Sequence, residues 1–460
     1  MNSPAAHYLE QCRALADSGV LPGQAGWLQA QRRAALAHFE EVGFPTQRDE
    51  DWRYTSIRPM TAKLFHAGDG GADARAITPA QIQATRIDGM KSHRLVFIDG
   101  LFAEQYSDST DSAQANAGVT VAPLARILDE SPERIEHALG TVAPRRRHGF
   151  TALNHAGARD GAVVLVEAGA RPALPVEMLF ISAAEDGLAQ PRNLVIAGAG
   201  GKVSLIERHL SANAHNTLTN SATEIALFDD AQVDYHLIQA QSTAAHHVCG
   251  VWARQARNSR FSCRSVTVGG RLVRNDLGAE LAGEHAHCDL FGLYAAAGAQ
   301  HVDNHTTITH AAAECSSREV YKGVLEQRAR AVFHGRIVVA KGAQKTDATQ
   351  ANNNLLLSRG AEIDTKPQLE IDADDVKCAH GATVGQLDAD ALFYLRARGV
   401  SEEDARRMLT FAFANDIIDK IAVAELKDAL VELLAQRLAG GIDNGGATAD
   451  ARASINGESS

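Results

Sequence analysis

The feature that most constrains the fold is the long run from Ala162 to Ile371, where the sequence is a series of short apolar segments. Several of these, among them AVVLVEAG, KVSLIERH and RAVFHGRIVVAKG, alternate apolar and polar side chains as β-strands do. Glycine, asparagine and aspartate, which favour turns, separate the segments. The helical patterns that would lie between the strands of a doubly wound sheet are missing. We therefore expect nearly pure β structure in this region.

The composition favours a solenoid, although the strand pattern also permits a sandwich or a barrel. Aromatic residues make up only 5% of the chain, so small aliphatic side chains must fill the core. Stacked rungs accept such side chains, and they place asparagine at tight corners where its amide bonds to the next rung. The region contains Asn220, Asn275, Asn304, Asn352, Asn353 and Asn354. We predict a parallel β-helix, and hence a mainly β protein.

Helical patterns precede and follow the β region. On the N-terminal side, helices are predicted from Ser3 to about Ala16, from Trp27 to Val42 and from Pro123 to Leu139, and RLVFI at 94–98 is predicted to be a strand. On the C-terminal side, helices are predicted at 387–399, from Ser401 onward and at 424–438. The predicted organisation is a helical and mixed domain at 1–160, a parallel β-helix at 161–386, a helical domain at 387–440 and a disordered tail at 441–460.

Charge and terminal sequence argue against several classes of protein. The net charge of −11 at pH 7 argues against non-specific nucleic-acid binding, which needs a basic surface. The N-terminus lacks the basic and apolar regions of a secretory signal, and no segment has the ~18 consecutive apolar residues of a membrane span. We therefore expect a cytoplasmic protein with reduced cysteines that binds neither nucleic acid nor membrane.

Motifs associated with catalysis are weak in this chain. The cluster GAGGKVS, from Gly198 to Ser204, lacks the spacing of a phosphate-binding or dinucleotide-binding loop, so we interpret it as a turn. No G-x-S-x-G nucleophile elbow occurs. Asp372, Asp374 and Asp375 could bind a cation in a β-helix polysaccharide lyase or hydrolase, but a solvated turn explains this charge run better.

The first candidate metal-binding group lies near residue 287. His285 and His287 are two residues apart and would share one face of a strand, with Cys288 next to them. Further along the chain come His301, His305 and His310. Imidazole and thiolate suit iron, zinc or copper, so an autonomous metal-binding protein remains an alternative function.

The second candidate group is the pair Cys378 and His380. In an extended segment the thiol and the imidazole share one face, and the preceding Lys377 would favour the thiolate. Two ligands do not fill a tetrahedral metal site. The other ligands must therefore come from elsewhere in the chain or from a partner.

Three stretches carry a family resemblance. They are SSREVYKGVLEQRARAVFHGRIVVAKGAQKTDATQANNNLLLS, KCAHGATVGQLD at 377–388 and RDEDWRYTSI near the N-terminus. They resemble the SufB/SufD family of iron–sulfur cluster assembly proteins, and the second is typical of the SufD branch. SufB-like members carry a cysteine near the rung of Asn352, Asn353 and Asn354 and a Glu-His pair near Cys378. This chain has neither feature, so it resembles the SufD branch.

The resemblance implies a right-handed parallel β-helix between helical domains and the role of a non-catalytic scaffold subunit. It implies pairing with a SufB paralogue, homodimer formation by the lone subunit, and docking of the SufC ATPase on the C-terminal helices. The candidates for docking are Met408, Leu409, Phe411 and Phe413. In the family a nascent cluster forms at the SufB–SufD interface, which implicates His380 and, less firmly, Cys378. No cofactor is expected to bind tightly to the lone chain, because the iron or cluster is transient.

Overall fold

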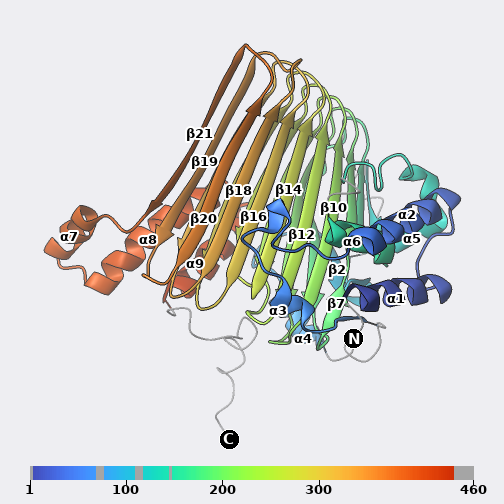
Figure 1. The fold of residues 1–460 in the computed structure, drawn as a ribbon, viewed down its shortest axis with the longest axis horizontal. Coiled ribbons are helices and arrows are strands. Elements are labelled where there is room, and N and C mark those ends of the chain that lie inside the picture. The colour runs from blue at the N-terminus through green and yellow to red at the C-terminus, as the bar shows by residue number, and fades with distance from the viewer. Residues whose placement is uncertain (1–3, 69–76, 109–117, 144–147, 440–460) are drawn as a thin grey trace, which may run out of the picture.

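Two sheets stacked face to face form the body of the protein (Figure 1). The structure, a computed structural model, describes residues 4–68, 77–108, 118–143 and 148–439. Sheet A has 11 strands and sheet B has 10. From residue 192 onward, consecutive strands alternate between the sheets, so each turn of the chain adds one strand to each sheet. The prediction of a mainly β protein built on a parallel solenoid is confirmed. The predicted disordered tail at 441–460 lies outside the described residues.

From β4 in sheet A and β2 in sheet B onward, neighbouring strands along each sheet follow one another in chain order. Sheet A runs β4 (Val119–Pro123), β5 (Ala162–Val166), β8 (Arg192–Ala197), β10 (Leu218–Leu227), β12 (His246–Gln255), β14 (Leu272–Leu281), β16 (His301–His310), β18 (Arg330–Val339) and β20 (Glu362–Ile371), with β7 (Gly187–Ala189) beside β10 and β1 (His66–Ala67) beside β7. Sheet B runs β3 (Leu101–Phe102), β2 (His93–Ile98), β6 (Val176–Ser182), β9 (Lys202–Ser211), β11 (Gln232–Ala240), β13 (Arg260–Thr267), β15 (His287–Ala296), β17 (Ser316–Leu325), β19 (Thr346–Leu356) and β21 (Val376–Gly385). The pairings along the solenoid are parallel, whereas β4–β5 and β2–β3 are antiparallel.

The core lies between the two sheets and takes every second side chain of each strand. In β11, for example, Val233, Tyr235 and Leu237 are buried within it. The asparagines do not lie at corners as predicted, because all six are in the strands β10, β14, β16 and β19. They still bond between rungs, and Asn275 Nδ2 donates to Asn304 Oδ1 at 3.0 Å. Polar ladders therefore run inside the solenoid together with the small aliphatic side chains.

One corner of the solenoid is a ladder of left-handed residues. They are Gly169, Gly200, Asp230, Asn258, His285, Glu314 and Lys345, with φ between 57° and 72°. The backbone N–H of each donates to a carbonyl of the following turn at 2.6–3.3 Å. Gly200 is the ladder residue between β8 and β9, so the interpretation of the glycine cluster as a turn is confirmed.

The N-terminal region is joined to the solenoid through its own strands, because β2 extends sheet B and β4 extends sheet A. Its helices are α1 (Pro4–Asp17), α2 (Gly26–Val42), α3 (Arg58–Thr61), α4 (Pro79–Ala84), α5 (Leu124–Glu130) and α6 (Gly149–Gly157). The predicted helix at 123–139 is wrong beyond Glu130. Pro132 cannot donate a backbone hydrogen bond within a helix, and it begins a separate 3-10 turn, Pro132–Arg134.

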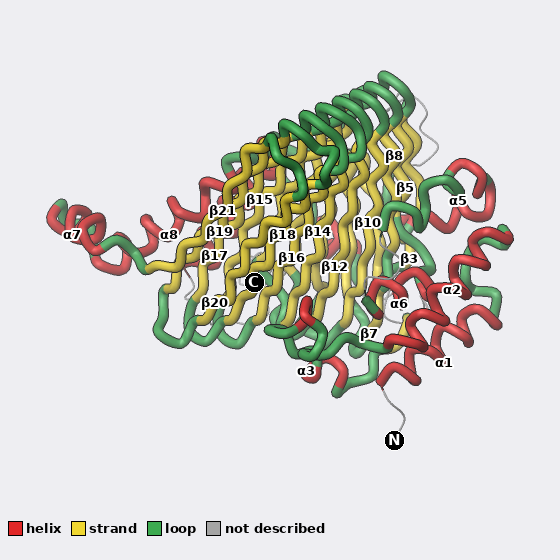
Figure 2. The backbone as a smooth tube through the Cα atoms, turned by 45° about the horizontal axis from the view of Figure 1, so that its top comes forward, coloured by secondary structure: helices red, strands yellow, loops and turns green. Residues whose placement is uncertain are grey.

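The C-terminal helices lie close to where the sequence predicts them: α7 (Ala389–Ala397), α8 (Glu402–Ile418) and α9 (Ala424–Ala439). Ser401 caps α8, since its Oγ accepts a hydrogen bond from the N–H of Asp404 at 3.0 Å. Ile417 of α8 and Leu430 of α9 pack with Ile238 on the outer face of sheet B. By contrast, α7 contains no buried residue and projects from the end of the solenoid (Figure 2). Within the described ranges, none of the helices has the length and apolar character needed to cross a membrane.

Candidate functional site

The solenoid ends in two edge strands. β20 and β21 are the last strands of sheets A and B, and no described strand pairs with their outer edges. Most of β21 is exposed, including Val384 at 49%. A strand of ten residues whose only lysine or acidic side chain is Lys377 is a ready template for pairing with another chain. We therefore take this open end as the candidate functional surface.

Cys378 and His380 lie on this surface, on the face of β21 that continues the solenoid interior. The register partner of His380 on β19 is Gln350, which is buried. Gln350 is in turn the partner of Glu319 on β17, and its Nε2 donates to Glu319 Oε2 at 2.7 Å. Glu319, Gln350 and His380 thus form a column that leads from the core to the open end. We refer to these three residues as the polar column.

Burial controls the acid–base properties near the polar column. It raises the pKa of Cys378, and the charge of Asp347 adds to this effect. The expectation that Lys377 favours a thiolate at this position is therefore wrong. Burial also raises the pKa of Glu319 to about 7, although hydrogen bonds from Gln350 and Thr306 oppose the rise. The column thus contains a carboxyl group that can hold or release a proton near neutral pH.

Replacing Glu319 by glutamine is expected to stabilise the fold at about pH 8 but not at about pH 4.5. Burial raises the pKa of this carboxyl from 4.5 to about 7. Below the pKa that the carboxyl has in the unfolded chain, the carboxyl contributes fully to the free energy of unfolding. This contribution is lost as the pH rises through the pKa that the carboxyl has in the folded protein. The neutral amide suffers no such loss, so the gain at high pH should reach roughly 3 kcal/mol. Urea denaturation at both pH values measures the difference.

Glu314→Gln is the matched control for this prediction. Glu314 is exposed and pairs with Lys345 at 3.0 Å, so removing its charge should give no gain at high pH. If Glu319→Gln changed stability equally at both pH values, titration of this carboxyl would not be the cause.

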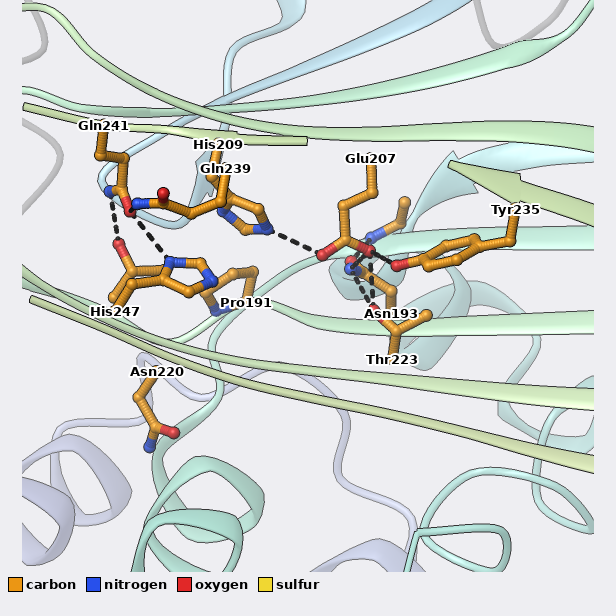
Figure 3. Close-up of polar contacts among 12 residues, drawn as sticks. Pro191, Asn193, Glu207, His209, Asn220, Thr223, Tyr235, Gln239, Gln241 and His247 are labelled. Atoms are coloured by element: carbon orange, nitrogen blue, oxygen red, sulfur yellow. Dashed lines mark hydrogen bonds and ion pairs between the residues drawn. The ribbon is translucent and has the colours of Figure 1, made fainter. Parts of the chain in front are cut away.

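A second polar group lies deeper inside the solenoid (Figure 3). Glu207 Oε2 accepts hydrogen bonds from Asn193, Thr223 and Tyr235 at 2.6–3.1 Å, and Oε1 lies 2.8 Å from His209 Nε2. Burial would raise the pKa of Glu207, but the bonds from its partners outweigh burial and lower it. Asn193 and Thr223 belong to sheet A and the others to sheet B. Because all five residues are fully buried, we interpret this group as a structural tie between the sheets.

The three metal ligands predicted near residue 287 do not converge. His285 is a left-handed corner residue rather than part of a strand, and its Nδ1 lies 3.3 Å from Glu314 Oε2. β15 begins at His287, whose Nε2 lies 3.1 Å from an oxygen of Asp289. Cys288 points into the core and is fully buried. The expectation that His285 and His287 share a strand face is wrong, because a corner separates them.

The acidic cluster considered for a lyase lies in the turn between β20 and β21. Asp372, Asp374 and Asp375 are all exposed there. This position agrees with the interpretation of the cluster as a solvated turn.

The residues predicted for docking on α8 divide into two groups. Met408 is 52% exposed, and Leu409 is half-buried. Phe411 and Phe413 instead pack against the cluster that joins the helices to sheet B. Sequence reasoning missed Phe393 and Tyr394 on α7, although the run LFYL at 392–395 was a signal of apolar surface in a short helix. It also missed Glu319 and Gln350 of the polar column, whose signal is a polar side chain at an inward position of each strand.

These features together define a β-solenoid protein with helical regions at both ends and a final rung with which no described strand pairs. Residues 180–413 match the family model for the SufBD core domain of SUF-system iron–sulfur cluster assembly, and residues 9–178 match the SufBD N-terminal region. The chain belongs to the SufBD family, which assigns it a role in iron–sulfur cluster assembly.

Individual relatives extend over nearly the whole chain. The protein is 31% identical to SufD of Escherichia coli over 90% of this chain and 93% of that protein. It is 31% identical to a SufBD family protein of Synechocystis over 93% of this chain and 95% of that protein. It is also 26% identical to SufD of Bacillus subtilis over 90% and 94% of the two chains. The resemblance to SufD is therefore confirmed.

Proposed function

We propose that the protein is the non-catalytic scaffold subunit of a SufB–SufC–SufD complex and pairs with a SufB paralogue through the open end. The observation that carries the proposal is the pair of exposed edge strands, β20 and β21, with His380 on the second. A partner with a similar solenoid can add a strand to each edge through backbone hydrogen bonds. A second copy of this chain can use the same edges, so a homodimer is expected when SufB is missing.

The same surface would hold iron or a nascent cluster as the cargo of the complex. Cys378 and His380 supply a thiol and an imidazole on one face of β21, and both suit iron. They fill half of a four-coordinate site, so ligands of the SufB partner would complete it. Glu319, with its raised pKa, lies two strands inward and can take up a proton released when the thiol becomes a ligand.

The SufC ATPase would dock on α7 and α8, which contact each other and expose large apolar side chains. Phe393, Tyr394 and Met408 are 74%, 56% and 52% exposed, respectively. Large apolar side chains that gather on a surface mark protein interfaces. Since α8 is also packed on sheet B through Ile417, movement of the docked ATPase would reach the sheet that ends in β21.

Co-expression with the SufB and SufC proteins of the same organism tests the proposal. We expect a complex of all three chains to survive affinity purification and gel filtration. Elution of this chain alone or as a homodimer, with both candidate partners present and folded, would refute the scaffold assignment.

The double variant Phe393→Ala/Tyr394→Ala is expected to weaken SufC binding about tenfold or more, because exposed aromatic anchors dominate such interfaces. Pairing with SufB should be unchanged, since neither residue lies on β20 or β21. Isothermal titration calorimetry with SufC measures the loss. Phe228→Ala, which removes a 45% exposed aromatic side chain between β10 and β11, is the control. Equal affinities in the variant and the control would place the docking surface elsewhere.

A further inference from the structure

Three metal-ligand side chains from distant parts of the chain meet on the outer face of sheet A. His305 on β16 and His334 on β18 are register partners, and their ring centroids lie 4.8 Å apart. Asp51 belongs to the 3-10 turn Glu50–Trp52, in the segment that crosses this face of the sheet (Figure 1). One potential ligand atom from each residue lies within 4.8 Å of the other two. Within the described ranges, no other group of three His, Cys, Asp or Glu side chains meets this criterion.

We propose that Asp51, His305 and His334 bind a divalent first-row transition metal ion. Two imidazoles and one carboxylate are the ligand set of non-haem Fe²⁺ sites, and they also bind Zn²⁺ and Co²⁺. None of the three residues lies on β21, so the site is separate from the open end and goes beyond the proposed function. We call these three residues the sheet A site.

Each of the two histidines has an oxygen atom beside its Nε2. The ring of His305 lies beside Asp303, with 3.1 Å between Nε2 and Oδ1, an ion-pair distance when the ring is protonated. His334 Nε2 lies 3.2 Å from Gln368 Oε1, whose amide is oriented because its Nε2 donates to Glu370. When Nε2 carries the proton, Nδ1 has the lone pair that a metal requires. Carboxylate and carbonyl partners of this kind accompany most metal-bound histidines.

Asp51 is held by a buried arginine rather than by the loop alone. Arg274 Nη1 donates to the backbone carbonyl of Asp51 at 2.7 Å, and its guanidinium lies 4.3 Å from the ring of Trp52. Thr55 on the same segment donates to Asp303 at 2.5 Å. The carboxylate of Asp51 is thus presented to the two histidines from a fixed backbone, which lowers the cost of assembling a site.

A cavity beside the histidines leaves room for the remaining coordination positions. It has a volume of about 90 Å³, and its lining includes His305, His334 and Asp364. Several waters fit in such a volume, as an open metal site requires. Two cations also line the cavity: Lys366 is paired with Glu50 at 2.9 Å, and the guanidinium of Arg53 lies 5.9 Å from the centre of the Tyr54 ring. Asp364, which lines the cavity but is not part of the three-ligand group, adds a second carboxylate that can bind through water.

Titration with Co²⁺ tests the sheet A site, because its visible absorption reports on the ligands. The parent is the full chain carrying Cys378→Ser and His380→Ala, so the open end cannot contribute. We expect saturable binding of one ion, with competition by Zn²⁺, which the same ligand set binds. His334→Gln and Asp51→Asn should each weaken binding by about tenfold or more. The Asn variant keeps the backbone carbonyl that Arg274 binds, and circular dichroism confirms folding.

His287→Gln is the matched control, since this histidine also lies beside a carboxylate, Asp289, but is not part of a three-ligand group. Its Co²⁺ affinity should equal that of the parent. Absence of saturable binding by the folded parent would overturn the proposal. Unchanged affinity in both His334→Gln and Asp51→Asn, or an equal loss in His287→Gln, would overturn it as well.

Discussion

Replacing Arg274 by alanine is expected to lower the free energy of unfolding by about 3–5 kcal/mol, because it breaks a fully buried ion network. Arg274 on β14 is 0% exposed and donates to Asp276 at 3.0 Å and to Asp303 at 2.7 Å. Burial would lower the pKa of this guanidinium, but the two carboxylates outweigh burial and raise it. Without the arginine, both carboxylates stay buried and lose their cation. Urea denaturation followed by circular dichroism measures the loss.

The loss should be accompanied by release of the N-terminal segment from sheet A. The guanidinium of Arg274 packs on Trp52 and bonds to Asp51, so its removal frees the segment on which both residues lie. We expect faster tryptic cleavage at Arg53 in the variant, under conditions where the solenoid itself is folded. Slow cleavage at this site despite a loss of stability would show that other contacts hold the segment.

Arg254→Ala is the control for the ion network. Arg254 on β12 pairs with Glu280 on β14 at 3.4 Å, but the two side chains are 60% and 47% exposed. Exposed pairs contribute less than about 1 kcal/mol. If the two variants lost the same stability, burial of the Arg274 network would not be the source of its contribution. Combining Arg274→Met with Asp276→Asn and Asp303→Asn should recover part of the loss, because no buried charge then remains in the group.

The solenoid was predictable because its rule is local. An inward side chain at every second position and a turn residue at each end identify a strand without any knowledge of its neighbours. The corners of the solenoid are less predictable from the sequence than the strands. Left-handed positions are occupied by Gly200 in one turn and by His285 or Lys345 in others, so the residue type does not mark the corner. A shift of two residues in the start of β15 was therefore enough to move His285 off the predicted strand face.

The sites depend on contacts that no local pattern contains. Lys366 and Glu50 form an ion pair although they are 316 residues apart in sequence. Asp51, next to Glu50, likewise lies close to His334. Cys378 and His380 could be paired beforehand only because they lie two residues apart on one strand. The acid–base properties of these side chains were harder to predict from the sequence than their positions. Lys377 precedes Cys378 in sequence, yet burial raises the pKa of the thiol, since desolvation depends on the packing of the final rung.

His380→Ala is expected to leave the three-subunit complex intact and to lower the yield of assembled cluster by about 10–100-fold, the range seen when groups that support a metal site are removed. The imidazole is exposed on β21, so its loss should affect folding little. Anaerobic reconstitution of the purified complex with iron and sulfide, followed by its visible absorption, measures the yield. Gel filtration of the same sample reports whether the three chains stay together.

Two variants on the same strand decide what a loss of yield means. Lys377→Ala alters the opposite face of β21. If the yield in His380→Ala falls because the strand edge is perturbed, it should fall in Lys377→Ala as well. If it falls because a ligand is missing, the yield in Lys377→Ala should be unchanged. Cys378→Ser should have the smaller effect of the two ligand changes, because burial raises the pKa of its thiol and disfavours the thiolate that binds iron. Dissociation of the complex in His380→Ala would make the residue structural. Full yield in an intact complex would remove it from the cluster site and leave the ligands to the SufB partner.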